Sequence, residues 1–296
     1  MKIEAVVVFY NPTKENIENI NYYIDSVEKV YVVDNTPFKD NSKLIPKNKK
    51  IIYLPNKKNL GIAKALNQGV EAAIESGAEW VLTMDQDSTF KKDDVTMMKD
   101  LLIKLKNDKK TYSKYDYDKI GILSPFHLIE QTKYDNPSGI EDKLIVMTSG
   151  NLINTKIFSK IGGFKSWMFI DCVDFDYCLN LVKNGYRVLQ YNDVKLKHNL
   201  GNTEKHKLFN KVLFVSNHGV DRRYYIARNR KYIYELYHDI FPEYCNAEVA
   251  TTKKDIIKII LYEKKKIKKI KAILEGLKDY RKRYVGERGS KTKFTD

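Results

Sequence analysis

The chain has 296 residues, of which 43% are hydrophobic and 12% aromatic, enough for one large α/β domain with an appendage. Its three cysteines, Cys172, Cys178 and Cys245, are odd in number and form no Cys-x-x-Cys pair, which argues against a disulfide framework and a zinc site. No apolar run approaches the roughly 20 residues of a membrane span, and the first residues show no signal-peptide pattern. We therefore expect a protein of the reducing cytoplasm.

The formal net charge of +15 is concentrated near the end of the chain. Residues 253–283 contain 13 Lys or Arg and four acids, so this segment contributes 13 − 4 = +9. A protein that binds nucleic acid over its main surface would spread this charge over the globular part. The distribution favours an interaction tail and no nucleic-acid partner.

Strands and helices alternate over the first 88 residues. The predicted strands are apolar runs at 5–9, 30–33, 51–54 and 80–84. The first predicted helix carries Ile17, Ile20 and Ile24, and the second begins after Asn59 and ends near Gly77. This order predicts a parallel sheet of the nucleotide-binding type, with polar residues at the strand ends gathered at one edge.

Asp85 and Asp87 follow the fourth strand directly. In an extended chain, side chains two residues apart point the same way, so these carboxylates are expected to converge. Two carboxylates suit a hard divalent cation, and the alternative is a solvated turn or a helix cap. Tyr10 and Asp34 are polar residues that also follow predicted strands, and their presence favours a binding site over a solvated turn or a helix cap.

After a charged surface helix within 91–119, strands are predicted at 120–123 and 144–147. The second would end at Ser149, Gly150 and Asn151, small and polar residues that let a ligand approach the backbone. Asp171, Asp174 and Asp176 then lie among aromatic residues, which favours raised pKa values. A helix follows them, so Asp174 or Asp176 could equally be an N-terminal cap.

Edge strands are predicted at 188–190 and 194–197, closing at His198, which with carboxylates would tolerate Mn²⁺ as well as Mg²⁺. The helix from Tyr224 carries Arg228, whose guanidinium suits a diphosphate; the alternative is an ordinary basic helix face. Beyond residue 240, apolar residues at spacings of three, four and seven predict one basic amphipathic helix. They are Ile256, Ile260, Ile267, Ile270, Leu274 and Leu277. Its partner could be an anionic membrane surface, the domain itself or a second subunit.

The order of these motifs resembles that of the family 2 glycosyltransferases, from about residue 3 to residue 235. The motifs are Tyr10-Asn11-Pro12, Val33-Asp34-Asn35, Asn59-Leu60-Gly61-Ile62-Ala63, Met84-Asp85-Gln86-Asp87-Ser88, Ser149-Gly150-Asn151 and Asp174-Phe175-Asp176. Within the family they look most like the bacterial rhamnosyltransferases that build O-antigens and capsules from dTDP-rhamnose.

The resemblance implies a GT-A fold, with a mostly parallel central sheet flanked by helices, in residues 1–240, and the basic helical tail in 241–296. It implies inverting transfer of one sugar from a dTDP- or UDP-sugar to a glycan acceptor, lipid-linked and met at the inner face of the cell membrane. It assigns nucleotide and donor contacts to Tyr10, Asn11, Asp34, Asn59, Gly61, Asn67, Asp85, Ser149, Gly150, Asn151 and Arg228. Mg²⁺ or Mn²⁺ would be held by Asp87, His198 and Asp85.

The resemblance makes Asp174 the general base. Many relatives have Glu-Asp where this chain has Val173-Asp174, so Asp171 and Asp176 stay as alternates. Two other functions are open: a nucleotidyltransferase of similar fold, which lacks support because no Gly-rich phosphate loop follows the first strand, and a non-catalytic protein that binds nucleic acid or a membrane surface. A homodimer is also compatible with the sequence.

Overall fold

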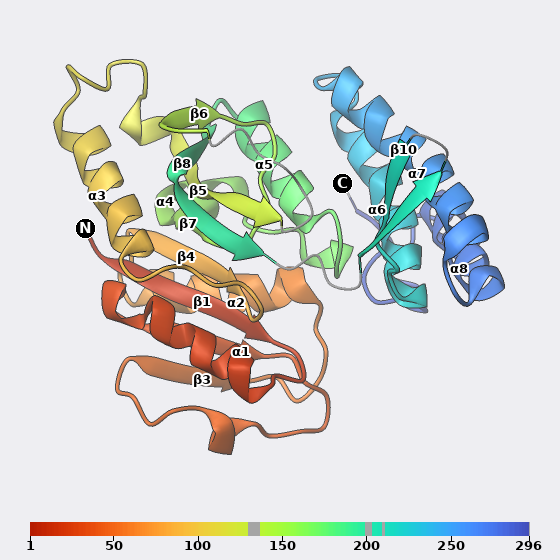
Figure 1. Ribbon diagram of the computed structural model, residues 1–296, viewed down its shortest axis with the longest axis horizontal. Coiled ribbons are helices and arrows are strands. Elements are labelled where there is room, and N and C mark those ends of the chain that lie inside the picture. Colours follow the sequence, from red (N-terminus) through yellow and green to blue (C-terminus); the bar gives the residue numbers. More distant parts are fainter. Residues whose placement is uncertain (130–136, 199–202, 209–210, 296) are drawn as a thin grey trace. The chain divides into compact units, whose positions relative to one another are not determined.

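A computed structural model describes residues 1–129, 137–198, 203–208 and 211–295 (Figure 1). Its contacts divide the chain into two compact units. Unit 1 comprises Met1–Lys165 and Tyr177–Asn199, and unit 2 comprises Ser166–Asp176 and Leu200–Asp296. The predicted domain boundary between residues 240 and 241 stays a prediction. The boundaries of the two compact units lie at other positions in the chain.

Unit 1 contains an eight-stranded mixed sheet in the described part of the chain, in the order β3-β2-β1-β4-β7-β5-β8-β6. Its strands are β1 (Ile3–Phe9), β2 (Val30–Asp34), β3 (Ile51–Pro55), β4 (Trp80–Asp85), β5 (Ile120–Ile129), β6 (Ile140–Asp142), β7 (Asn151–Asn154) and β8 (Arg187–His198). The first four strands are mutually parallel, and β7 and β6 run against their neighbours. The predicted α/β class, with a mostly parallel central sheet, is confirmed.

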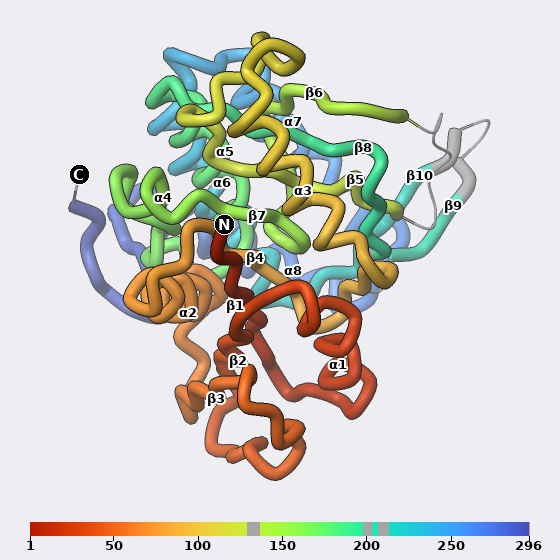
Figure 2. The backbone as a smooth tube through the Cα atoms, turned by 90° about the vertical axis from the view of Figure 1, so that its left-hand side faces the viewer, coloured from red at the N-terminus to blue at the C-terminus, as the bar shows by residue number. Residues whose placement is uncertain are grey.

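Helices cover both faces of this sheet (Figure 2). They are α1 (Lys14–Glu18), α2 (Ile62–Glu75), α3 (Asp94–Asn107), α4 (Thr155–Ile161) and the greater part of α5 (Val173–Lys183). One face of β1 packs with the buried side chains of α3 and with two short 3-10 turns after α1, Asn19–Tyr22 and Ile24–Ser26. On the other face Gly69 of α2 meets Val6 so closely that an added Cβ would lie 2.4 Å from Cγ1 of Val6. The continuous apolar strands are explained by this double cover.

Unit 2 combines helices with a two-stranded antiparallel ribbon, β9 (Glu204–Leu208) and β10 (Lys211–Val215). The helices are α6 (Val220–Tyr237), α7 (Pro242–Tyr262) and α8 (Lys266–Arg281). Both α7 and α8 pack on α6. None of the helices in the described ranges combines the length and the apolar character that a membrane crossing requires.

The first predicted helix is shorter than expected, because α1 ends at Glu18 and Ile20 and Ile24 lie in the 3-10 turns after it. The structure differs from the prediction at three further places. Residues 144–147 form no strand; β7 instead begins at Asn151, because a short apolar run can equally be a buried loop. The two predicted edge strands are one strand, β8, between β5 and β6. A register shift opposite Pro125 and Phe126 leaves residues 192–194 without partners on β5, which explains the gap in the pattern.

The third difference is in the tail, where two helices replace the single one expected. The α-helix α7 ends at Tyr262 because Glu263 adopts an extended backbone (φ −89°, ψ 158°) and Lys265 a left-handed one (φ 55°). The apolar spacing continues through this break, which is why the sequence suggested one helix.

Candidate functional site

The carboxyl ends of three parallel strands meet at one edge of the sheet in unit 1. Phe9 of β1 pairs with Asp34 of β2, and Val8 pairs with Asp85 of β4. Gln86 joins two of these ends, since its Oε1 accepts a hydrogen bond from the Tyr10 amide (2.8 Å) and its Nε2 donates to the Tyr10 carbonyl (3.3 Å). Tyr10, Asp34 and Asp85 are therefore neighbours, as predicted. Gln86 was part of a quoted motif but was given no role.

Asp34 is almost fully buried, and its carboxylate holds the loop that follows β2. It accepts hydrogen bonds from the Thr36 amide (2.9 Å), Asn41 Nδ2 (2.8 Å) and the Tyr53 hydroxyl (2.7 Å). Burial, followed by this hydrogen bond, raises the pKa of Tyr53. Asp34 therefore holds the loop after β2 in place through hydrogen bonds to other protein groups. This loop is the one in which a nucleotide contact was predicted.

The start of α2 lies at the same edge. Asn35 at the end of β2 donates from Nδ2 to the Gly61 carbonyl (3.0 Å), and the Gly61 amide donates to Asn59 Oδ1 (2.9 Å). Gly61 has φ 82°, a left-handed conformation that favours glycine. A helix N-terminus at a sheet edge is suited to a phosphate group.

Two other predicted donor contacts have different places. Asn11 is exposed with φ 49°, and its amide donates to Thr36 Oγ1 (2.8 Å). Asn67 bonds the main chain of Phe164 in both directions, donating from Nδ2 to the carbonyl (2.8 Å) and accepting from the amide at Oδ1 (3.0 Å). Asn67 therefore ties α2 to residue 164, a structural contact that its helical position did not reveal.

Asp85 and Asp87 differ in their surroundings. Asp85 is half-buried at the end of β4 and its amide donates to Ser149 Oγ (3.0 Å), whereas Asp87 is exposed. The chain turns at Gln86 and Asp87, so the extended geometry expected for the pair is replaced by a turn. Across the side chains that the structure describes, no group of three His, Cys, Asp or Glu residues is placed to hold a metal ion. Two carboxylates still fit Mg²⁺ or Mn²⁺ where diphosphate oxygens and water supply the other ligands.

The end of β8 runs beside the turn that carries Asp87. The amides and carbonyls of Thr89 and Lys197 exchange hydrogen bonds of 3.2 and 3.1 Å. His198 directly follows Lys197, the hydrogen-bonded partner of Thr89. The side chain of His198 lies outside the described residues. No sequence pattern indicated this pairing.

Contacts within the protein stabilise the loop at residues 149–151, where the sequence predicted that a ligand approaches the backbone. The carbonyl of Ser149 lies 2.7 Å from His127 Nε2, and Asn151 Nδ2 donates to the Met147 carbonyl (2.8 Å). Gly150 has φ 82°, and a Cβ there would lie 2.8 Å from side-chain atoms of Pro125 and Leu196. Glycine is required at this position by packing. His127 was missed because a lone histidine in a strand carries no signal.

The three candidate bases lie in unit 2 and differ in exposure. Asp176 is fully buried and its Oδ1 accepts from the Tyr237 hydroxyl (2.8 Å); burial and the Asp176 carboxylate raise the pKa of Tyr237. Asp171 forms an ion pair with Arg222 and its side chain is 8% exposed. Asp174 is half-buried in the first turn of α5, where its Oδ1 accepts from the Phe175 amide (3.0 Å). Of the three, Asp174 is the acid whose position suits contact with a ligand best.

The loop before α5 is held in a strained conformation. Phe169, Asp171 and Cys172 all have positive φ, between 63° and 68°. Asn229 of α6 holds this loop, because its Nδ2 lies 2.9 Å from the carbonyls of Met168, Ile170 and Asp171. Since one amide group has two hydrogens, the three acceptors share them. Asn229 is a positioning residue that sequence patterns did not single out.

Arg228 has a structural place in this unit. Its side chain is 0% exposed, and its guanidinium donates to the carbonyls of Gly286 (2.7 Å), Met168 (3.1 Å) and Trp167 (3.3 Å) and to Asn229 Oδ1 (3.0 Å). These contacts engage both ends of the guanidinium fork. A role as diphosphate clamp would require Arg228 to give them up.

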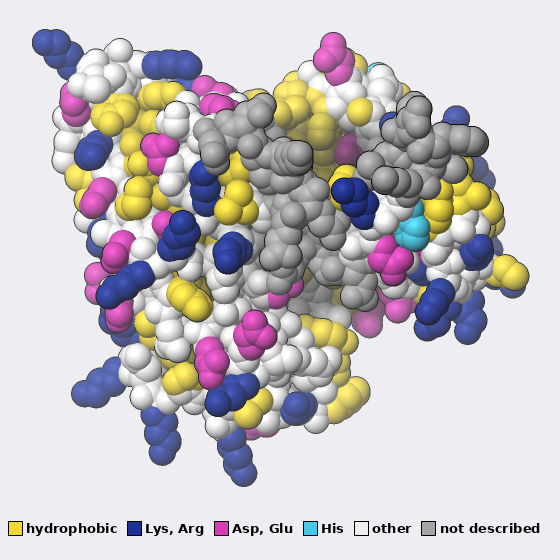
Figure 3. Space-filling model, in the orientation of Figure 1, with side chains coloured by type: hydrophobic (Ala, Val, Ile, Leu, Met, Phe, Trp, Pro, Cys, Tyr) yellow, Lys and Arg dark blue, Asp and Glu magenta, His cyan; other side chains and the backbone are white. Residues whose placement is uncertain are grey.

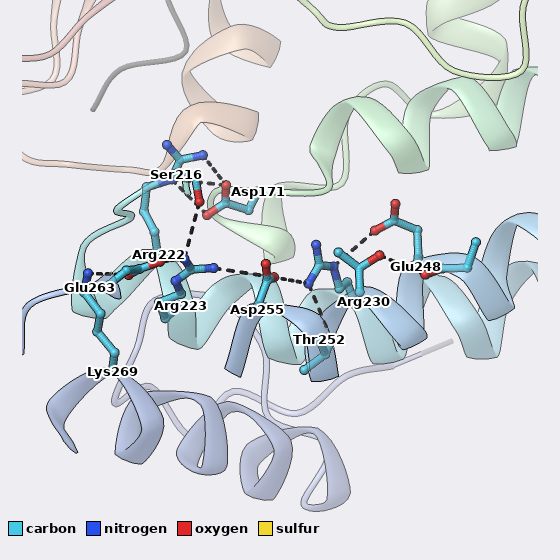
Figure 4. A network of polar contacts seen from close by, with 12 residues as sticks. Asp171, Ser216, Arg222, Arg223, Arg230, Glu248, Thr252, Asp255, Glu263 and Lys269 are labelled. Atoms are coloured by element: carbon cyan, nitrogen blue, oxygen red, sulfur yellow. Dashed lines mark hydrogen bonds and ion pairs between the residues drawn. The ribbon is translucent and has the colours of Figure 1, made fainter. Parts of the chain in front are cut away.

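A second buried polar network joins α6 to the end of α7 (Figure 4). Arg223 and Lys269 both pair with Glu263, at 2.5 and 2.6 Å, and Arg230 pairs with Asp255 at 2.8 Å. Burial and the surrounding cations, Arg222 first, lower the pKa of His218 to about 3. This network explains why the turn after α7 is fixed at Glu263.

The comparisons with known proteins agree with this geometry. The model of the family described as "Glycosyl transferase family 2" matches residues 5–158, from within β1 into α4, and this range includes the residues at the ends of β1, β2 and β4. A curated relative, "dTDP-rhamnosyl transferase RfbF" of Shigella flexneri, is 28% identical over 244 residues, covering 77% of this chain and 78% of the relative.

Solved structures share the fold at low sequence identity. The structure of S. aureus TarS 1-349 in complex with UDP-GlcNAc matches 95% of this chain and 80% of that chain, with a TM-score of 0.54 and 15% identity. GalNAc-T7 with UDP, GalNAc and Mn²⁺ has a TM-score of 0.53 and 11% identity over 70% of this chain, which spans only 44% of that protein. The fold is therefore that of the GT-A glycosyltransferases, and the chain belongs to glycosyltransferase family 2.

Proposed function

We propose that this glycosyltransferase moves one rhamnose from dTDP-rhamnose to a hydroxyl group of a bacterial surface glycan, with inversion at the anomeric carbon and with Mg²⁺ or Mn²⁺ as cofactor. The Shigella flexneri relative, which is covered over most of its length, supports the nucleotide and the sugar. The UDP-sugar complex of TarS makes a UDP-sugar the alternative donor.

One observation carries the proposal: the strand ends of β1, β2 and β4 bring Tyr10, Asp34 and Asp85 to one edge, with exposed Asp87 beside them. In open α/β sheets, ligands bind at this edge. The nucleotide would be bound along the loop that Asp34 and Asn41 shape and at the start of α2. Asp85 and Asp87 would hold the cation.

The chemistry needs charge stabilisation at the leaving group. As the anomeric bond breaks, negative charge grows on the diphosphate, and a bound divalent cation supplies Lewis-acid stabilisation there. Asp87 would orient this end of the donor from the turn after β4, and the amides at the start of α2 would add positive potential.

The acceptor hydroxyl must lose a proton as it attacks. We assign this proton to Asp174, because Asp171 is engaged by Arg222 and Asp176 is buried against Tyr237. The carboxylate takes the proton while the hydroxyl oxygen attacks opposite the leaving diphosphate, which inverts the configuration. The proposed acceptor is lipid-linked and is met on the cytoplasmic side of the membrane.

A donor panel tests the proposal directly. Thermal denaturation is followed with dTDP-rhamnose, dTDP-glucose, UDP-GlcNAc and GDP-mannose, each with Mn²⁺, because a ligand that binds only the folded protein raises Tm. At a concentration 100 times Kd the stabilisation is about 2.7 kcal/mol. We expect dTDP-rhamnose to raise Tm most, and release of dTDP to follow when acceptor extract is added.

The outcome separates the parts of the proposal. A larger Tm shift with a UDP-sugar would transfer the specificity to that donor and reject rhamnose. The absence of a shift with every donor, in the presence of Mn²⁺, would reject the assigned nucleotide edge.

A further inference from the structure

The two C-terminal helices turn one face toward α6, and several large side chains on their other faces are exposed. Ile259, Ala272 and Ile273 are buried, and Gly276 lies so close to α6 that an added Cβ would be 2.4 Å from the Tyr224 carbonyl oxygen. The opposite faces of α7 and α8 are therefore the accessible ones.

Large aliphatic side chains are exposed where these two helices meet. Ile257, Ile260 and Leu261 follow at i, i+3 and i+4 on α7, so they share one helix face. Their exposed fractions are 57%, 49% and 49%, and that of Ile267, in the first turn of α8, is 72%. We call the segment 257–268, which contains these residues and the turn, the α7–α8 tip.

The charge around this tip has one sign. Residues 253–271 contain nine lysines and two acids. The acids are Asp255 and Glu263, and both are buried in ion pairs with Arg230, Arg223 and Lys269. The other eight lysines are exposed or half-exposed, so solvent meets lysine and aliphatic side chains together. Figure 3 shows dark blue and yellow side chains next to one another over α8.

The turn of the tip is fixed from below. Glu263 is 2% exposed and accepts hydrogen bonds from both Arg223 and Lys269, as Figure 4 shows. The three lysines that follow this buried anchor, Lys264 to Lys266, are exposed. Because the buried Glu263 already orders the turn, binding through these lysines and Ile267 would not have to include the entropic cost of ordering it.

We propose that the α7–α8 tip docks on the surface of a bilayer that contains anionic phospholipids. Lysine heads would lie among the lipid phosphates while the four aliphatic side chains enter the headgroup and acyl boundary. A nucleic acid would satisfy the lysines but leave the aliphatic side chains in water. A second copy of the chain would bring like charges together. The bilayer is the partner that accommodates both kinds of side chain.

Vesicle co-sedimentation of the full chain tests this docking. The vesicles contain phosphatidylcholine alone or with phosphatidylglycerol. One variant replaces three cations (Lys264→Gln, Lys265→Gln, Lys266→Gln), and the other replaces two aliphatic residues (Ile260→Gln, Ile267→Gln). We expect the wild-type chain to bind the anionic vesicles only, and the triple variant to bind roughly 100-fold more weakly.

Matched controls lie on unit 1. Lys43, Lys47 and Lys49 are exposed, so their triple change to Gln alters net charge equally, and changing the exposed Phe38 and Leu44 to Gln provides the control for loss of apolar surface. We expect both controls to bind as the wild type does. Equal binding by tip variants and wild type, or equal losses in the controls, would overturn the proposal. So would tip-dependent binding to duplex DNA, or a tip-dependent dimer in sedimentation equilibrium, without vesicle binding.

This inference and the proposed function fail separately. Vesicle binding is measured without nucleotide sugar, and the thermal shift with donors is measured without lipid. The tip variants are expected to keep the Tm shift with the donor.

Discussion

The three aspartates around the start of α5 have different hydrogen-bond and ion-pair partners. Asp171 pairs with a guanidinium, Asp176 accepts a hydrogen bond from a tyrosine hydroxyl, and Asp174 accepts one from the Phe175 amide in the first turn of α5. Removing the carboxylate charge at each position should therefore have three distinct effects.

Asp174→Asn is expected to lower kcat by about 10²–10⁴-fold, the usual contribution of a general base. The affinity for dTDP should not change, because the assigned nucleotide contacts lie elsewhere. Steady-state kinetics and calorimetry on the same preparation measure both. If Asp174→Asn turns over normally while Asp171→Asn does not, the base is Asp171.

His218 gives unit 2 a dependence on pH. Burial and neighbouring cations lower its pKa from 6.5 to about 3 in the folded protein. The contribution to stability is therefore complete above about pH 6.5 and is lost as pH falls toward 3, because the unfolded chain takes up the proton first. Between pH 8 and pH 5, this one residue should remove up to about 2 kcal/mol from the free energy of unfolding.

Urea unfolding of the wild type and of His218→Gln at both pH values checks this effect. We expect the difference between pH 8 and pH 5 to be smaller in the variant. An identical pH dependence in both proteins would show that His218 is not held neutral.

Among the elements, the contact of α6 with α8 depends on one glycine. In a helix, alanine is normally about 1 kcal/mol more favourable than glycine. At Gly276 the sign should reverse, because the new Cβ would meet the Tyr224 carbonyl oxygen at 2.4 Å and main-chain atoms cannot move aside as a side chain can. Gly276→Ala is expected to destabilise unit 2 by about 1–3 kcal/mol.

The control is Lys271→Ala on the exposed side of the same helix, which should change the stability little. Thermal unfolding followed by circular dichroism compares the two variants. A Gly276→Ala protein as stable as the wild type would mean that the helices separate at this point without cost.

Local patterns predicted most elements of unit 1. The apolar runs of β1, β2, β3 and β4 and the helix predicted between Asn59 and Gly77 all correspond to elements of the structure. What failed depended on distant residues. The register shift against β5 makes two predicted strands parts of β8, and one predicted helix is divided at Glu263, whose carboxylate pairs with the distant Arg223. Neither partner is visible from the local sequence.

The candidate site was predicted in outline for the same reason. Strand-end acids follow from the order of strands, so the neighbourhood of Tyr10, Asp34 and Asp85 could be expected. The hydrogen bonds that engage Asn67, Arg228 and Asp34 with protein groups could not, because they join residues far apart in the chain. The positioning role of Asn229 was hidden likewise.

On the scale of the whole molecule, the chain consists of two compact units whose segments alternate along the sequence. Residues 166–176 leave the first unit and group with the C-terminal helices, and no change of composition marks this point. The family match ends at residue 158, so it covers the nucleotide edge and not the proposed base. The central claim therefore rests on the acids that follow β4.

Calorimetric titration of dTDP with and without Mn²⁺, into the wild type and Asp87→Ala, tests that claim most directly. The account predicts that Mn²⁺ strengthens the binding of dTDP to the wild type at least tenfold, about 1.4 kcal/mol, and that Asp87→Ala loses this gain. Equal affinities in all four titrations would contradict it.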